Sequence, residues 1–165
     1  MKIVYGIKHL NGLRSLNGKV DYSSTDWIEV PGNGAYIAHT GGMWSSSHSL
    51  GGTNYELFAC RKELFCRGIP NGVRCWKRVR RLPLTTVRRR AIFAEILDKC
   101  AETGPWSALK YAAKLLTPER LDKCAEINSW AALAHAAELL TPAQLDKCAE
   151  ECPVAALKYA AKLLT

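Results

Sequence analysis

Features that would assign this 165-residue chain to several large protein classes are missing from its sequence. No apolar run approaches the roughly 20 residues that a membrane-spanning helix needs, so we expect no integral membrane protein. Residues 1–6 are too few and too quickly polar for a signal peptide, which predicts a cytoplasmic protein. The seven cysteines are an odd number, and without an export signal we expect reduced thiols. The composition, 48% hydrophobic and 23% charged, excludes wholesale disorder.

Motifs of known enzyme classes are also absent. The chain contains no P-loop, no GxSxG, no HExxH and no dinucleotide-binding fingerprint. His39 and His48 flank Gly41-Gly42 and the serines at 45–47, which could form a nucleophile–base pair, but no acidic partner stands at a telling position. We therefore predict that the protein is not an enzyme, and we keep a small enzyme using His39 and His48 as an alternative.

The cysteines of the first half could form a metal site only at unusual spacings. Cys60, Cys66 and Cys75, with His48 upstream, follow C-x5-C and C-x8-C spacings, without the tight knuckle of structural zinc sites. These spacings also differ from compact iron–sulfur patterns. We expect buried thiols, no metal and no cofactor.

A net positive charge is found in only one stretch of the sequence. The formal net charge of the whole chain is +8. Residues 61–90, called the basic stretch below, hold eleven basic side chains against Glu63 alone. The preceding sixty residues are neutral, and residues 91–165 have a net charge of −2. One short stretch thus accounts for the whole excess, which favours an anionic partner.

A repeat of 24 residues fills the second half. The hexapeptide LDKCAE begins at Leu97, Leu121 and Leu145, with no insertion between copies. A fixed period in this range indicates a solenoid of stacked units. Thr117-Pro118 and Thr141-Pro142 place a capping hydroxyl before a proline, as at a helix start.

Each copy predicts two short helices. The first carries residues such as Leu121, Cys124 and Ala125 on one face. The second directs inward Trp106, Leu109, Ala112, Ala113 and Leu116, with their counterparts one period later. Such a pair cannot bury its own apolar stripe, so three copies would stack into a continuous core.

This repeat resembles the leucine-rich repeat variant family, whose units also have 24 residues and a Thr-Pro helix start after an Ala-rich helix. The resemblance covers Leu97 to Thr165 and implies a right-handed superhelix of alternating helical layers, one of them often 3₁₀. Some relatives carry an iron–sulfur cluster in a cysteine-rich segment, which the cysteines here do not match. Leu115-Leu116 precede Thr-Pro where the family has a break, so we expect fuller α-helices in both layers.

The repeats differ at positions that the core does not dictate. These outward positions form either a solvated face or a binding face. The last copy keeps its apolar pattern to Leu164, so self-association, a partner or a continuation of the chain would cover its outer face. The candidate repeat-face residues are Lys110, Tyr111, Lys114, His135, Lys158, Tyr159 and Lys162.

The first half of the sequence predicts a β domain, because short β-prone runs alternate with Gly-containing turns. We expect an α+β chain: a small antiparallel β domain followed by a three-repeat α-helical solenoid. The expected boundaries are residues 1–82 for the β domain, 83–96 for a basic linker and the start of a capping helix, and 97–165 for the repeats.

A hairpin is the most informative part of the β domain. Residues 64–69 and 73–80 flank a Pro70-Asn71-Gly72 turn. Strand alternation predicts that Arg74, Trp76, Arg78 and Arg80 share one face, with Val73, Cys75 and Val79 on the other. An exposed tryptophan among arginines suits phosphate pairing with base stacking, or capture of an acidic protein. A charged edge strand that prevents aggregation is the alternative.

These observations predict a non-enzymatic binding protein that engages nucleic acid or an acidic macromolecular partner. A second hypothesis is a protein–protein inhibitor from a phage or mobile element, which would block a host nucleic-acid-targeting defence complex. The candidate binding residues are Arg67, Arg74, Trp76, Lys77, Arg78, Arg80, Arg81, Arg88, Arg89 and Arg90.

Overall fold

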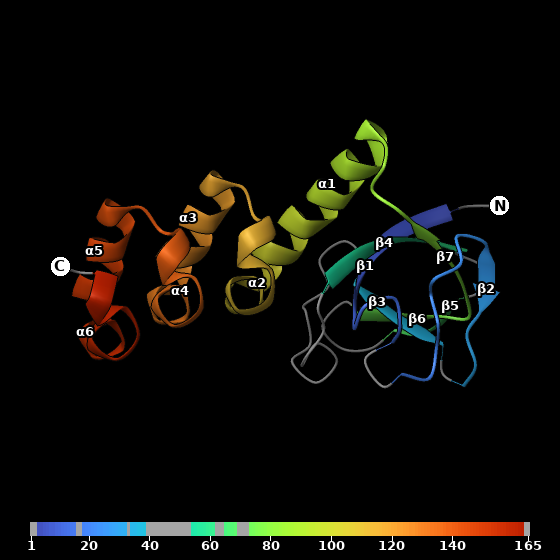
Figure 1. The fold of residues 1–165 in the computed structure, drawn as a ribbon, viewed down its shortest axis with the longest axis horizontal. Coiled ribbons are helices and arrows are strands. Elements are labelled where there is room, and N and C mark those ends of the chain that lie inside the picture. Colours follow the sequence, from blue (N-terminus) through green and yellow to red (C-terminus); the bar gives the residue numbers. More distant parts are fainter. Residues whose placement is uncertain are drawn as a thin grey trace. The chain divides into compact units, whose positions relative to one another are not determined.

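The chain divides into two compact units, one up to Thr103 and one from Gly104. This division falls inside the first repeat copy, which begins at Leu97. The computed structural model describes residues 3–15, 18–32, 34–38, 54–61, 65–68 and 73–163. The fold class is the expected one, α+β, with an antiparallel sheet followed by helices (Figure 1). No helix in the described part of the chain has the length and apolar character needed to cross a membrane.

The first unit is built on one seven-stranded sheet in the order β2-β7-β4-β1-β3-β6-β5. Every strand pair is antiparallel, and β1 and β4 pair over their full length. The strands are β1 (Ile3–Leu10), β2 (Trp27–Glu29), β3 (Ala35–Ala38), β4 (Asn54–Arg61), β5 (Phe65–Gly68), β6 (Val73–Trp76) and β7 (Arg78–Leu82).

The core of this unit lies against the central strands. Alternate residues of β4, such as Phe58 and Cys60, are buried in it, as are Ile37 of β3 and the ring of Tyr22. Tyr22 and Phe58 pack edge to face, with ring centroids 5.1 Å apart. Helix α1 (Val87–Thr103) contacts β1 and buries an apolar stripe. That stripe consists of Phe93, Ile96, Leu97, Cys100 and Ala101.

The expected basic strand is interrupted at Lys77. Strand β6 pairs with β3 and β5, whereas β7 pairs with β2 and β4. Trp76 and Val79 are both fully buried, although residues three apart in a continuous strand point to opposite faces. The bend at Lys77 resets the alternation. The expectation of an exposed Trp76 is therefore wrong, because this side chain belongs to the core.

Close packing around Trp76 also depends on Gly34. Its φ of +87° lies in the region that favours glycine, and a Cβ there would lie 2.7 Å from the main-chain oxygen of Trp76. The expected hairpin is present as the antiparallel β5–β6 pair, with an irregularity between Phe65 and Arg67. The predicted turn at 70–72 lies outside the described residues.

The second unit consists of short helices in two rows, α2, α4 and α6 in one and α3 and α5 in the other (Figure 1). Both Thr-Pro helix starts are confirmed: Thr117 and Thr141 accept hydrogen bonds from main-chain N–H groups, and Thr141 forms a capping box with Gln144. The helices are α2 (Pro105–Ala112), α3 (Pro118–Ile127), α4 (Ser129–His135), α5 (Pro142–Glu151) and α6 (Pro153–Ala155).

The first two copies have α-helices in both layers, as expected, but the second helix of each is short. Helices α2 and α4 pass into 3₁₀ turns at 113–115 and 137–139, and the residues after those turns, Leu116 and Leu140, are extended. Proline restricts the residue before it to extended conformations, so Thr117 and Thr141 cannot continue the preceding helix. In the third copy, α6 continues as a π-helical segment at 156–160 and a 3₁₀ turn at 161–163.

Equivalent residues of successive copies fill the interior. Leu109 and Leu133 are fully buried, and Cys124 and Cys148 are buried as expected. Leu157, the counterpart of Leu109 and Leu133 in the third copy, is 76% exposed. Val154 and Leu163 of the same copy are also exposed. The outer face of the last copy is thus apolar and open, as the sequence predicts, while self-association through it stays a prediction.

Candidate functional site

The arginine segment, defined here as the basic residues between Lys77 and Arg90, connects the sheet to α1. Two of its members, Lys77 and Arg80, form hydrogen bonds to the connections that follow and precede β2. The Lys77 ammonium donates to the carbonyl oxygen of Gly32 at 2.5 Å, and Arg80 Nε donates to that of Thr25 at 2.6 Å. Both side chains are thereby held in place by neutral acceptors. The segment comprises Lys77, Arg78, Arg80, Arg81, Arg88, Arg89 and Arg90.

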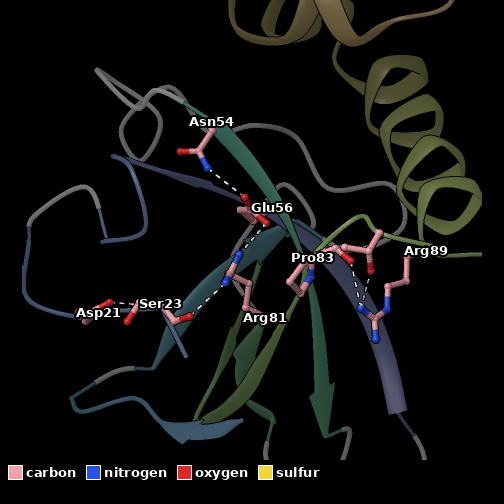
Figure 2. A network of polar contacts seen from close by, with 8 residues as sticks. Asp21, Ser23, Asn54, Glu56, Arg81, Pro83 and Arg89 are labelled. Atoms are coloured by element: carbon pink, nitrogen blue, oxygen red, sulfur yellow. Dashed lines mark hydrogen bonds and ion pairs between the residues drawn. The ribbon is translucent and has the colours of Figure 1, made fainter. Parts of the chain in front are cut away.

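Arg81 is at the centre of a polar network on the sheet (Figure 2). Its Nη2 donates to the carbonyl oxygen of Ser23 at 3.1 Å, and its Nη1 lies 3.6 Å from the carboxylate of Glu56. Glu56 also accepts a hydrogen bond from the Asn54 amide, and Asp21 accepts one from the Ser23 main chain. Since both Arg81 and Glu56 are mostly buried, loss of either one would leave the other as an uncompensated buried charge, and Glu56 neutralises the Arg81 charge.

The second group, Arg88, Arg89 and Arg90, lies at the start of α1. Arg89 Nη1 donates to the carbonyl oxygen of Pro83 at 3.1 Å, a bond visible in Figure 2, and Arg90 Nη1 donates to that of Leu84 at 3.2 Å. Arg88, which precedes both, is exposed. These bonds fold the two guanidinium groups back over the turn that precedes the helix.

The acceptors of these bonds determine the electrostatics of the segment. A carbonyl oxygen satisfies an N–H donor but carries no formal charge, so the cation keeps its full charge. Lys77, Arg80, Arg89 and Arg90 are all held in this way. The arrangement fixes positive charge along β7 and at the start of α1, which attracts anions and costs little further side-chain entropy on binding.

Several predicted site residues cannot be placed. Arg67 and Arg74 belong to β5 and β6, but their side chains lie outside the described residues, as do His39 and His48 entirely. The enzyme alternative that uses these histidines therefore stays a prediction. Within the described ranges, no group of three or more metal-ligating side chains comes together. Burial raises the pKa of the Cys60 thiol, in agreement with the expected packing role.

The second candidate site is a row of aromatic rings on the second unit, called the aromatic row below. Within one copy, Trp106 lies edge to face with Tyr111 at 6.2 Å, and Trp130 with His135 at 6.0 Å. Between copies, Trp106 meets His135 at 6.3 Å and Trp130 meets Tyr159 at 6.0 Å. The five rings are thus continuous across three repeats.

Lysines lie over the rings at both ends of the row. The ammonium of Lys110 is 4.8 Å from the ring centroid of Trp106 and 5.1 Å from that of Tyr111. Lys158 lies 4.9 Å from the ring of Tyr159. These are cation–π distances, and they combine flat apolar surface with positive charge.

The row is only partly covered by the protein. Trp130 is 44% exposed and Tyr159 is 40% exposed, whereas Trp106 and Tyr111 are half-buried. Partial desolvation first, and then the charge of Lys110, lower the pKa of His135 below its usual value, which favours the neutral form of this ring.

The two helical rows of this unit carry opposite charges. Helices α2, α4 and α6, with the turns that follow them, hold Glu138 as their one acidic residue among the described ones, against four lysines. Helices α3 and α5 hold six acidic and three basic residues. The four lysines, Lys110, Lys114, Lys158 and Lys162, are on the same helices as the aromatic row.

The sequence identified only part of this row. Tyr111, His135 and Tyr159 were expected on an outward face, and the structure brings them together. Trp106 and Trp130 were expected in the core, which is wrong for Trp130, since it is largely exposed. The signal that could have identified them is the constant spacing of five residues from each tryptophan to the next ring.

Comparisons with known proteins add no relatives: scans of protein-family models, curated proteins and solved structures each returned no match. The resemblance of the repeats to the leucine-rich repeat variant family therefore stays a prediction from the sequence.

Proposed function

We propose that this protein binds nucleic acid, without chemical conversion, through phosphate contacts along the arginine segment. The observation that supports this most directly is the bonding of four cations to main-chain carbonyls rather than to carboxylates. Phosphate groups are the natural partners of such fixed guanidinium groups. Contacts to phosphate carry little sequence information, so we expect weak discrimination between sequences.

The buried Trp76 changes how this binding would work. A side chain in the core cannot stack on a base, so Trp76 contributes no stacking and the arginine segment would bind through its charge. Duplex and single strand would both bind to the arginine segment, because both present phosphates.

The test is the salt dependence of oligonucleotide binding by the full chain. Each phosphate contact contributes a slope of about −0.9 in log affinity against log salt for duplex. Arg88→Gln removes an exposed cation, so it should reduce that slope by about 0.9 and weaken all sequences alike. Lys123→Gln is the matched control, since it removes one exposed positive charge from the acidic helix α3.

Two outcomes would contradict the proposal. One is the absence of binding to any oligonucleotide at low salt. The other is equal displacement of the oligonucleotide by polyglutamate of the same charge, which would favour an acidic protein as the partner.

A further inference from the structure

We infer that the aromatic row of the second unit is a stacking platform for single-stranded nucleic acid. This inference rests on the proposed function and deepens it by naming the form of nucleic acid. It depends on Trp106, Tyr111, His135, Trp130 and Tyr159, which form one continuous set of ring contacts.

Packing between repeats explains only part of this arrangement. Edge-to-face contacts join neighbouring copies and contribute about 0.5 to 1.5 kcal/mol each beyond area burial. A ring needed only for such contacts would be buried, but Trp130 is 44% exposed and Tyr159 is 40% exposed. The tightly packed interior is already filled by residues such as Leu109 and Leu133. The exposed ring surface is therefore available to a ligand.

Charge selects an anionic ligand for this face. Lys110 and Lys158 lie directly over rings of the row, and Lys114 and Lys162 are exposed on the same helical layer. Aromatic clusters also bind quaternary cations, but lysines on the ring faces repel a cation. The acidic residues are concentrated on α3 and α5, so an anion is attracted to one layer and repelled by the other.

A ligand that is both anionic and rich in flat apolar faces fits this surface best. Unpaired nucleotides have both properties, because every base has a π-face and every linkage a negative charge. In a duplex the base faces are already stacked, and an acidic peptide offers no such faces. Helical-repeat proteins can present one base to each repeat, so three copies would hold about three nucleotides.

The experiment compares three probes on the full chain: a short mixed-sequence single strand, the same strand with abasic sugars, and the corresponding duplex. Trp130→Ala should weaken binding of the intact strand about 5- to 150-fold, the range expected for loss of one base stack. Binding of the abasic strand and the duplex should not change, and the salt slope should stay constant because no phosphate contact is lost. Trp130→Phe should restore most of the lost affinity.

A gain of function keeps the test independent of folding defects. Val154 occupies the position equivalent to Trp106 and Trp130 in the third copy and is 79% exposed. Val154→Trp would extend the row beside Tyr159 and should strengthen binding of the intact strand alone. Ile127→Ala, an exposed apolar truncation on α3, is the control and should leave all three affinities unchanged.

The outcomes separate this inference from the proposed function. If Trp130→Ala and Val154→Trp bind the intact strand like the wild type while binding stays salt-dependent, the stacking platform is refuted and the phosphate-binding proposal stands. An equal loss for the intact and abasic strands on Trp130→Ala would also refute the platform. If no probe binds even at low salt, both proposals fail.

Discussion

Trp76 lies in the core and not on an exposed basic face of the hairpin, and Trp76→Ala tests this placement. Burying an aromatic side chain removes about 150–250 Å² from water, and at about 25 cal/mol per Å² this corresponds to about 4–6 kcal/mol. Truncation of a buried tryptophan to alanine costs about 3–5 kcal/mol. Because Trp76 is 1% exposed, we expect a loss in that range. An exposed tryptophan would cost no more than about 0.5 kcal/mol.

The assay must read the first unit alone, because a chain of two compact units does not have a single free energy of unfolding. Hydrogen exchange of the full chain in increasing urea measures the opening of each unit through its own amides. Trp130→Ala is the control, since its cost should appear in the second unit and leave the amides of β4 and β6 unchanged.

A gentler variant covers the case in which Trp76→Ala unfolds the unit. Trp76→Phe keeps an apolar ring in the core, so the fold should persist and the affinity for oligonucleotides should be that of the wild type. The reasoning would be refuted if Trp76→Ala changed the stability of the first unit by less than about 0.5 kcal/mol while weakening oligonucleotide binding. That result would place the indole at the surface.

Two further substitutions test local features of each unit. Gly34→Ala places a Cβ 2.7 Å from the main-chain oxygen of Trp76 and should therefore destabilise the first unit. Gly32→Ala is the control, because Gly32 also has a positive φ but its Cβ would meet open space. Equal losses of stability in urea unfolding would contradict the close approach at Gly34. The pKa of His135, followed by NMR, should lie below 6.5 and rise only in part on Lys110→Met, because burial is the larger cause. A His pKa lowered by folding means that the unfolded chain binds the proton more tightly, so the stability contributed by this group is complete above pH 6.5 and declines as the pH falls below it. A wild-type value at or above 6.5 would refute this account.

The repeat architecture could be predicted because its evidence is local and repeated. The identical hexapeptides fix the period, and Thr-Pro marks each helix start by capping chemistry alone. The prediction that Trp130 points into the core was wrong because helical periodicity indicates which side of a helix is apolar. It does not indicate how much space is available for a side chain on that side. Alanines such as Ala108 and Ala132 let the helices approach closely, and an indole does not fit between them.

The hairpin was harder to predict because its outcome depends on distant strands. Residues 73–80 alternate as one strand would, except that Trp76 falls on the basic face and Lys77 on the apolar face. This exchange is the local sign of the break, and the sequence alone does not say how the chain resolves it. The break arises because β6 pairs with β3 while β7 pairs with β4, so each half follows a different neighbour. Trp76 lies in the core because of this pairing between strands that are distant in the sequence. The run of basic residues in the sequence does not reveal their main-chain acceptors, which for Lys77 and Arg80 lie in the connections around β2.

Net charge alone does not reveal the lysine-rich layer of the repeats. The second unit carries as many acidic as basic residues, so its total charge gives no reason to expect an anionic ligand. The 24-residue repeat separates the two signs, because residues 24 apart lie in the same helical layer. An anion that approaches such a surface meets lysines and exposed rings on one layer and carboxylates on the other. Charge then orients the ligand and stacking retains it, so changes to the arginine segment should alter the salt slope of binding, while changes to the aromatic row should alter affinity at constant slope.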